Sequence, residues 1–239
     1  MVLRLSVLLT VLVLAVTPAL AADFTESGLT GSVQQEPSGR DVYCLTQNVD
    51  PNYLEAGTGV ACGSGFGTTD NFYLRRFHLT DDHGINLPFT VMDVTFGIET
   101  SDLAWPIEVR IYSIPTGSPL LLANLTLLWV SNATAPPGDL YFVGPVPVGG
   151  TIDPSADDLV VEMFNPNGQD DFQFLYPGCN PLGETQPTYL YAPDCGLTEP
   201  TPTGQIGFPD AQWVLTVCGE DEVVATEDRA WTGVKSLYR

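Results

Sequence analysis

Basic side chains are scarce in this sequence. Lysine and arginine together number 8 in 239 residues, against 29 aspartate and glutamate residues, and Lys235 is the one lysine. The formal net charge is −21. A surface that follows a phosphate backbone or an anionic membrane needs clustered Lys and Arg, which this composition does not supply. We therefore expect neither nucleic acid nor an anionic membrane as a partner.

The sequence also lacks the motifs of common catalytic sites. It contains two histidines, His78 and His83, and no Gly-x-Ser-x-Gly, no His-Glu-x-x-His and no cysteine pair at zinc spacing. The run Asp81-Asp82-His83 is typical of a solvated turn. We expect a protein that is not an enzyme. The alternative is a hydrolase whose Ser-His-Asp site is assembled in space and is invisible in the sequence.

The longest apolar run lies at the start of the chain, and no second run approaches the length of a membrane span. Residues 1–22 carry one charge at Arg4, an apolar run over 5–16, and then Pro18 followed by Ala-Leu-Ala. This pattern predicts a secretory signal peptide that is cleaved after Ala21 or Ala22. Its removal leaves seven basic residues against 29 acidic ones, a formal charge of −22. We expect a secreted or cell-surface protein without a transmembrane helix.

Five cysteines in an exported chain predict disulfides with one cysteine left over. Proximity in the sequence favours the pairs Cys44–Cys62 and Cys179–Cys195, which leaves Cys218 unpaired. Spacing alone does not decide the pairing. Cys218 could instead displace one of these partners or bridge to another chain.

Alternation with period two predicts strands in the middle of the chain. Apolar and polar residues alternate over 91–99 and again over 107–112, so each run has one face for a core and one for water. The short polar link that ends at Pro106 suits a connection between neighbouring strands. Hydrophobic residues make up 44% of the chain, enough to fill a core. We predict an all-β fold, an antiparallel, jelly-roll-like β-sandwich of about nine strands with no substantial helix.

Composition divides the rest of the chain into three parts. A loose leader at 23–41 follows the signal peptide, the β-sandwich domain spans 42–219, and an acidic linker with a short tail occupies 220–239. The tail contains aromatic and basic residues, which suits either a sorting or recognition tag or an ordinary packed terminus.

Residues 120–130 form an apolar run that Asn124 and Thr126 interrupt. A run without alternation predicts a central strand or a strand with a bulge. Trp129 and Trp213 lie in apolar runs, so we expect both in the core.

Three stretches resemble known proteins. They are D-N-F-Y-L-R-R-F-H-L at 70–79, the Gly-x-Thr-x-Pro-x-Tyr-Leu-x-Ala-Pro-x-Cys-Gly-like stretch at 183–196, and I-G-F-P-D-A-Q-W-V-L-T-V at 206–217. Over 42–219 the chain resembles uncharacterised secreted bacterial proteins with a jelly-roll or galactose-binding-like β-sandwich. The resemblance implies a surface or adhesion role and provides no catalytic residues.

Two kinds of ligand have candidate residues. Calcium needs several oxygen ligands from nearby loops, and two acidic or amide-rich groups could supply them: Asp153, Asp157 and Asp158, or Asn165, Asn167, Asp170 and Asp171. Both groups also suit ordinary polar turns, and the acidic composition suits solubility equally well. A glycan needs exposed aromatic rings beside polar groups, for which the candidates are Trp105, Tyr189 and Tyr191.

These observations predict a non-catalytic secreted or cell-surface structural or adhesion module, with an extracellular protein or a glycan as its partner. One alternative is a carbohydrate-binding module with a structural calcium ion. Another is a self-assembling extracellular subunit, in which Cys218 or an unpaired edge strand makes the contact.

Overall fold

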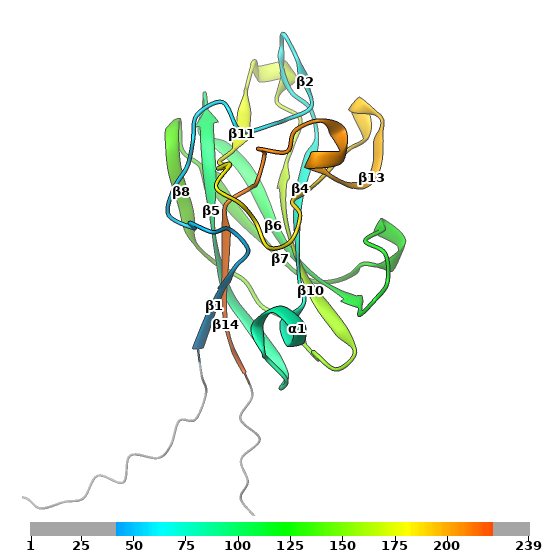
Figure 1. Ribbon diagram of the computed structural model, residues 1–239. Coiled ribbons are helices and arrows are strands. Elements are labelled where there is room, and N and C mark those ends of the chain that lie inside the picture. Colours follow the sequence, from blue (N-terminus) through cyan, green and yellow to red (C-terminus); the bar gives the residue numbers. More distant parts are fainter. Residues whose placement is uncertain (1–41, 222–239) are drawn as a thin grey trace, which may run out of the picture. The chain divides into compact units, whose positions relative to one another are not determined.

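A computed structural model describes residues 42–221 (Figure 1). The predicted signal peptide, the leader at 23–41 and the tail beyond residue 221 lie outside the described residues. Within the described range, no helix is long and apolar enough to cross a membrane.

Two antiparallel sheets form a sandwich, as predicted. The sheet named here the β5 sheet runs in the order β1-β14-β5-β11, with β8 and β9 also pairing with β5; its strands are β1 (Val42–Thr46), β5 (Phe89–Ser101), β8 (Gly138–Pro147), β9 (Thr151–Ile152), β11 (Leu175–Pro177) and β14 (Leu215–Asp221). The β10 sheet has the order β13-β12-β4-β10-β6-β7; its strands are β4 (Asn71–Phe77), β6 (Trp105–Pro115), β7 (Thr126–Ala135), β10 (Asp157–Asn165), β12 (Tyr189–Ala192) and β13 (Leu197–Pro202).

The remaining elements are short. A separate hairpin pairs β2 (Gly63–Ser64) with β3 (Gly67–Thr68). Over residues 42–221, the helical segments are α1 (Leu79–His83), η1 (Leu122–Asn124), η2 (Gln169–Asp171), η3 (Pro193–Cys195) and η4 (Thr203–Ile206). The described strands number fourteen, more than the nine predicted. Several of them have only two or three residues, which is too short to show an alternating pattern in the sequence.

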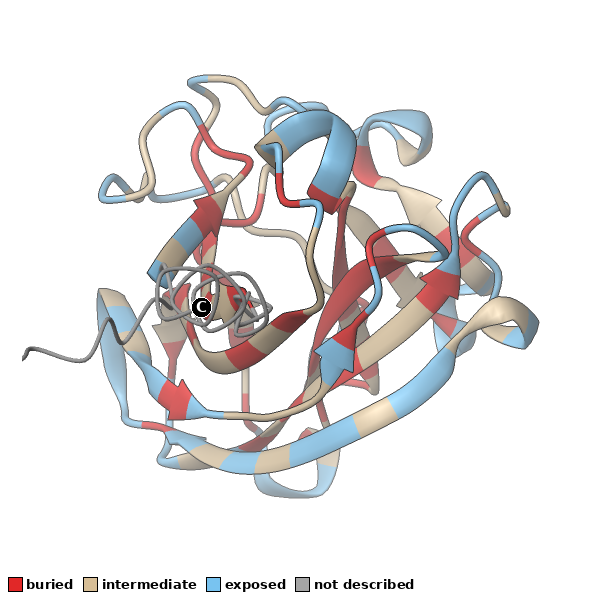
Figure 2. Cartoon of the chain, turned by 90° about the horizontal axis from the view of Figure 1, so that it is seen from below, coloured by how far each residue is buried: buried red, intermediate tan, exposed pale blue. Residues whose placement is uncertain are grey.

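The core lies between the two sheets. Alternate residues of β5, such as Phe96 and Ile98, meet alternate residues of β6, such as Val109 and Ile111, and all four are buried. Figure 2 shows the buried positions along the strands that surround the interior. Full burial of one such side chain contributes roughly 1.5–3 kcal/mol to the free energy of folding. The two alternating runs therefore lie in opposite sheets and face each other, and the predicted neighbouring arrangement is wrong.

The apolar run at 120–130 does not form a central strand. β7 begins only at Thr126 and lies at the edge of the β10 sheet, and its register with β6 shifts between Ile111 and Tyr112. The predicted bulge is therefore present. Leu120 instead packs on the outer face of the sheet, against Ile114 and Val160. Packing of Leu120 on the outer face of the sheet explains why the start of this run is apolar although it does not form a central strand.

The predicted disulfide pairing is wrong. Cys44 of β1 is bonded to Cys218 of β14, and Cys62 is bonded to Cys195. Strand pairing explains the first bond, because the β1–β14 register places Cys44 directly opposite Cys218. Cys179 is the free cysteine in the described range; it is buried, and burial raises the pKa of its thiol. Two disulfides are typical of a protein in an extracellular or otherwise oxidising environment.

Candidate functional site

Two phenylalanines form an exposed pair at one end of the sandwich. Phe66 lies in the turn between β2 and β3, and Phe172 directly follows η2. Their exposed fractions are 61% and 62%, and their ring centroids lie 5.9 Å apart with planes inclined by 59°. The β2 hairpin marks this end of the domain in Figure 1. A pair of large aromatic side chains that folding leaves in water is a candidate contact surface.

Local hydrogen bonds hold the two rings together. The backbone N–H of Phe66 donates to Ser64 Oγ at 3.2 Å, and Gln169 Nε2 donates to the same oxygen at 2.9 Å. Gly67 has a φ of +143°, and a Cβ there would come within 2.7 Å of the Gln173 carbonyl oxygen. Only glycine therefore allows the hairpin to approach η2 this closely.

The backbone of Phe172 is strained. Its φ is +54° and its ψ is +35°, in the left-handed region that bulky residues rarely adopt. This conformation costs roughly 1–2 kcal/mol relative to right-handed geometry. Strain that persists in a folded protein tends to occur at functional sites. Here it turns an aromatic ring outward beside Phe66.

Polar groups surround the aromatic pair. Asp70 Oδ1 accepts from the Asn167 N–H at 2.8 Å, and Asn167 Oδ1 accepts from the Gln169 N–H at 2.9 Å. Asp170 and Asp171 lie in η2, directly before Phe172. Three residues of the second predicted calcium group, Asn167, Asp170 and Asp171, are therefore at this end, and Asn165 is buried at the end of β10.

The two predicted calcium groups lie apart. Asp157 and Asp158 are at the start of the nine-residue strand β10, Asp153 lies in the turn before it, and the other group lies at or beyond its end. Nine residues span about 26 Å at roughly 3.3 Å per residue. Asp158 is already paired with Arg76, at 2.6 Å. Across residues 42–221, no three His, Cys, Asp or Glu side chains are grouped as a metal ion requires, and calcium binding stays an untested prediction.

The predicted glycan residues do not form one platform. Trp105 packs against the core between the sheets, and its Nε1 donates to the Pro166 carbonyl at 3.3 Å. Tyr189 and Tyr191 lie on the other side of the β10 sheet, in the cluster that covers its outer face. The centroid of the Tyr191 ring lies 4.7 Å from that of the Phe72 ring, so Tyr191 packs against another side chain of the protein.

The sequence analysis missed Phe66 and Phe172. Phe66 is an isolated aromatic residue in a glycine-rich loop, and Phe172 begins the run F-Q-F-L-Y, whose pattern suggests a short strand and not an exposed site. The available signal was the run G-S-G-F-G, because a phenylalanine between turn glycines has no neighbouring apolar residues with which to form a core face.

A network of ionisable side chains lies on the outer face of the β10 sheet. Arg110 lies 2.6 Å from Glu108 and 3.0 Å from Glu162, and its guanidinium is 4.6 Å from the centroid of the Phe164 ring. Glu162 is buried, and burial raises its pKa to about 7 against the attraction of Arg110.

The raised pKa predicts a pH dependence of stability. Because the folded state holds the Glu162 proton more tightly than the unfolded chain, its contribution is present below the ordinary pKa of 4.5 and is lost as pH rises through about 7. We expect the free energy of unfolding of Glu162→Gln to fall less than that of the wild type between pH 5 and pH 8. Urea unfolding of both proteins at each pH measures this difference. An identical pH dependence in the two proteins would contradict the prediction.

A polar cleft of about 320 Å³ contains the residue types of a hydrolase, among them His78, Ser155 and Asp158. His78 Nδ1 lies 2.9 Å from Asp158 Oδ2. The Ser155 hydroxyl, however, donates to Asp153 Oδ1 at 2.7 Å. The imidazole and carboxylate are paired, but the hydroxyl is engaged elsewhere, and the hydrolase alternative stays an untested prediction.

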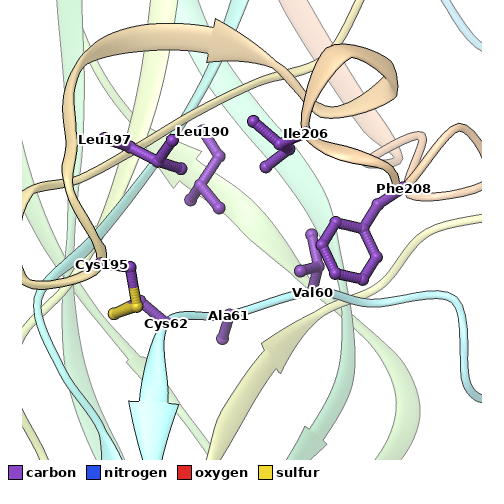
Figure 3. A pocket seen from close by; sticks show the side chains of 8 residues that line it. All are labelled: Val60, Ala61, Cys62, Leu190, Cys195, Leu197, Ile206 and Phe208. Carbon is purple, nitrogen blue, oxygen red and sulfur yellow. A yellow bond between two sulfur atoms is a disulfide. The ribbon is translucent and has the colours of Figure 1, made fainter.

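An apolar pocket of about 280 Å³ lies beside the segment that leads into β2 (Figure 3). Its lining combines aliphatic and aromatic side chains with the Cys62–Cys195 disulfide; the residues are Val60, Ala61, Cys62, Leu190, Cys195, Leu197, Ile206 and Phe208. No polar side chain lines it, so it suits an apolar group and offers no orienting hydrogen bond from a side chain.

Comparison with known proteins adds little to this geometry. No protein-family model and no curated protein matches the sequence. The structure of infectious bursal disease virus Gx strain matches with a TM-score of 0.26 and 12% identity over 79% of this chain. The match spans 38% of the viral chain's length. Similarity this low says nothing about function, and the resemblance to secreted bacterial proteins stays a prediction.

Proposed function

We propose that this protein is an exported, non-catalytic adhesion module that binds a neutral glycan through Phe66 and Phe172. The observation that carries the proposal is the pair of adjacent rings, each more than half exposed, one of them on strained backbone. Aromatic rings beside amide and carboxylate groups are the surface that sugar rings contact, because C–H groups pack on the ring and hydroxyls bond to the polar groups.

Charge supports a neutral ligand. Asp70, Asp170 and Asp171 lie around the pair, and the whole chain has 29 acidic residues against 8 basic ones. These carboxylates repel acidic polysaccharides and anionic lipid surfaces. An uncharged sugar polymer meets no such repulsion, and its hydroxyls can donate hydrogen bonds to carboxylate oxygens.

Truncation of either ring tests the proposal. We expect Phe66→Ala and Phe172→Ala each to weaken glycan binding about tenfold, a loss of roughly 1.4 kcal/mol. The measurement is pull-down on a panel of neutral polysaccharides (cellulose, mannan, xylan and galactan), followed by titration of the best binder. Phe142→Ala is the matched control, because Phe142 is also an exposed phenylalanine but lies on β8. The proposal would be overturned if the wild type bound none of the four polysaccharides. It would also be overturned if Phe66→Ala bound as tightly as the wild type.

Phe172→Gly separates binding from folding. Glycine adopts the left-handed region without the Cβ clash, so this variant is expected to be at least as stable as the wild type while it binds about tenfold more weakly. A variant that binds poorly because it is unfolded would show a lower midpoint in urea. A lower urea midpoint for Phe172→Gly would show that the left-handed backbone at residue 172 is not strained, and backbone strain would then no longer support the proposal.

A further inference from the structure

The polar cleft of about 320 Å³ lies beside α1, where several segments of the chain meet. Its lining residues are His78, Thr80, Asp81, Asn86, Thr116, Pro154, Ser155 and Asp158. In Figure 1, α1 and the β2 hairpin lie at opposite ends of the domain, so the cleft is separate from the Phe66–Phe172 pair. Sites for small ligands have volumes of roughly 300–1,000 Å³, and the cleft therefore suits a small molecule.

The side-chain donors of this cleft are largely used within the protein. Each lining hydroxyl has one hydrogen to donate. The acceptors are the Ile85 carbonyl for Thr80 at 3.2 Å, Asp158 Oδ1 for Thr116 at 3.2 Å, and Asp153 Oδ1 for Ser155 at 2.7 Å. The amide nitrogen of Asn86 donates to the Gly84 carbonyl at 2.8 Å. The hydroxyl oxygens keep lone pairs that can accept hydrogen bonds from a ligand.

His78 adds another acceptor. Its Nδ1 lies 2.9 Å from Asp158 Oδ2, and because an ionised carboxylate only accepts, the hydrogen is on Nδ1. In the neutral ring, Nε2 is therefore an acceptor. Asp158 is buried, and Arg76 donates to the same Oδ2 from two nitrogens, at 2.9 Å and 2.6 Å. These bonds hold the carboxylate that orients the imidazole.

The cleft also has an excess of negative charge. Arg76 compensates the charge of Asp158, and its third nitrogen donates to the Ser118 carbonyl at 2.6 Å. Asp81 is exposed, and no ion pair within residues 42–221 engages it. The lining residues of the cleft include no lysine and no arginine. A cleft of acceptors with a free carboxylate favours a cation that donates hydrogen bonds.

We propose that this cleft binds a small primary amine in its ammonium form. An ammonium group has three N–H donors and no acceptor, which complements the acceptors of the cleft. His78 Nε2 and the Asp81 carboxylate accept two of its hydrogen bonds, and a lining hydroxyl oxygen accepts the third. A quaternary ammonium ion has the same charge but no N–H, so it cannot use these acceptors.

Titration of ethanolamine hydrochloride into isotope-labelled protein tests the site by NMR at constant ionic strength. We expect saturable shifts of backbone amides at 78–86, 116 and 154–158. Choline, which has the same charge without N–H donors, is expected to bind at least about tenfold more weakly. His78→Asn retains an amide donor for Asp158 but has no acceptor at the position of Nε2. Its dissociation constant for ethanolamine is expected to rise about tenfold.

Asp81→Asn removes the free carboxylate and is also expected to weaken ethanolamine binding about tenfold. Asp82→Asn is the matched control. It makes the same change in charge at the next residue of α1, but Asp82 does not line the cleft, and its Oδ2 accepts from Gln186 Nε2 at 2.8 Å. Because salt screens charges in water, this variant is expected to bind within about twofold of the wild type.

Three results would each overturn the proposal. The first is an absence of saturable shifts in the wild type up to about 10 mM ethanolamine, a concentration that would largely fill a millimolar site. The second is choline binding as tight as that of ethanolamine. The third is equal weakening by Asp81→Asn and Asp82→Asn, which would indicate attraction by net charge alone. Equal urea midpoints for the wild type and the variants ensure that the comparison is between folded chains.

Discussion

Replacement of Cys62 and Cys195 by alanine is expected to lower the free energy of unfolding by about 5 kcal/mol. The bond joins residues 133 positions apart, so the unfolded chain without it gains the entropy of a very long open loop. Domains of this kind are stable by roughly 5–15 kcal/mol, so the loss is a large part of the total. Urea unfolding of the variant and the wild type in one buffer measures it.

The Cys44–Cys218 bond provides the matched control. Its sequence separation is 174, and because loop entropy grows with the logarithm of length, its removal is expected to cost nearly the same. The two variants should differ in glycan binding, since Cys62 directly precedes the hairpin that carries Phe66, whereas Cys44 and Cys218 join β1 to β14. If both variants had the same free energy of unfolding as the wild type, the predicted stabilisation by the two disulfides would be wrong. Equal binding by both variants would contradict the anchoring of the hairpin by Cys62.

Periodicity is a local property, and it predicted the local structure. The alternating runs at 91–99 and 107–112 are strands β5 and β6, and Trp213 is fully buried as expected. Pairing between strands is not local. Cys44 meets Cys218 because the first described strand pairs with the last, and no spacing along the chain encodes that register.

Burial also depends on distant segments. Trp129 lies in an apolar run like Trp213, yet its strand has a neighbour on one side only, and it remains half exposed against Gly149. Likewise, Phe66 and Phe172 become a site only because the β2–β3 hairpin packs on η2, about a hundred residues away. Sequence reasoning could classify each segment but could not place two of them together.

The two arginines of β4 show the same limit. Arg75 and Arg76 are adjacent in β4, and both are buried, on opposite faces of the sheet. Arg76 pairs with Asp158, and Arg75 pairs with Glu184 at 2.9 Å. Both partners come from segments more than eighty residues later in the chain. The acidic excess of the sequence is what makes such partners available to each of the few cations.

Substitution of Arg75 by methionine is expected to destabilise the fold by roughly 3–5 kcal/mol. The Arg75 side chain is fully buried, and burial lowers its pKa while Glu184 opposes that change. Its guanidinium also donates to the backbone carbonyls of Trp213 at 3.0 Å and Gln186 at 2.9 Å. Methionine fills similar volume but leaves two carbonyls without the Arg75 donor and leaves Glu184, to which Thr188 still donates, without its cation. Urea unfolding measures the loss.

A second substitution identifies the cause. In Arg75→Met/Glu184→Gln the orphaned carboxylate is gone, so about half of the lost stability is expected to return. Arg75→Lys keeps the charge but lacks the planar fork that reaches two carbonyls and a carboxylate together, so it is expected to fall between the wild type and Arg75→Met. If the double variant were no more stable than Arg75→Met, the loss would come from the missing carbonyl bonds rather than from the unpaired charge. The polar backbone groups, and not the ion pair, would then determine why a scarce arginine is retained in this core.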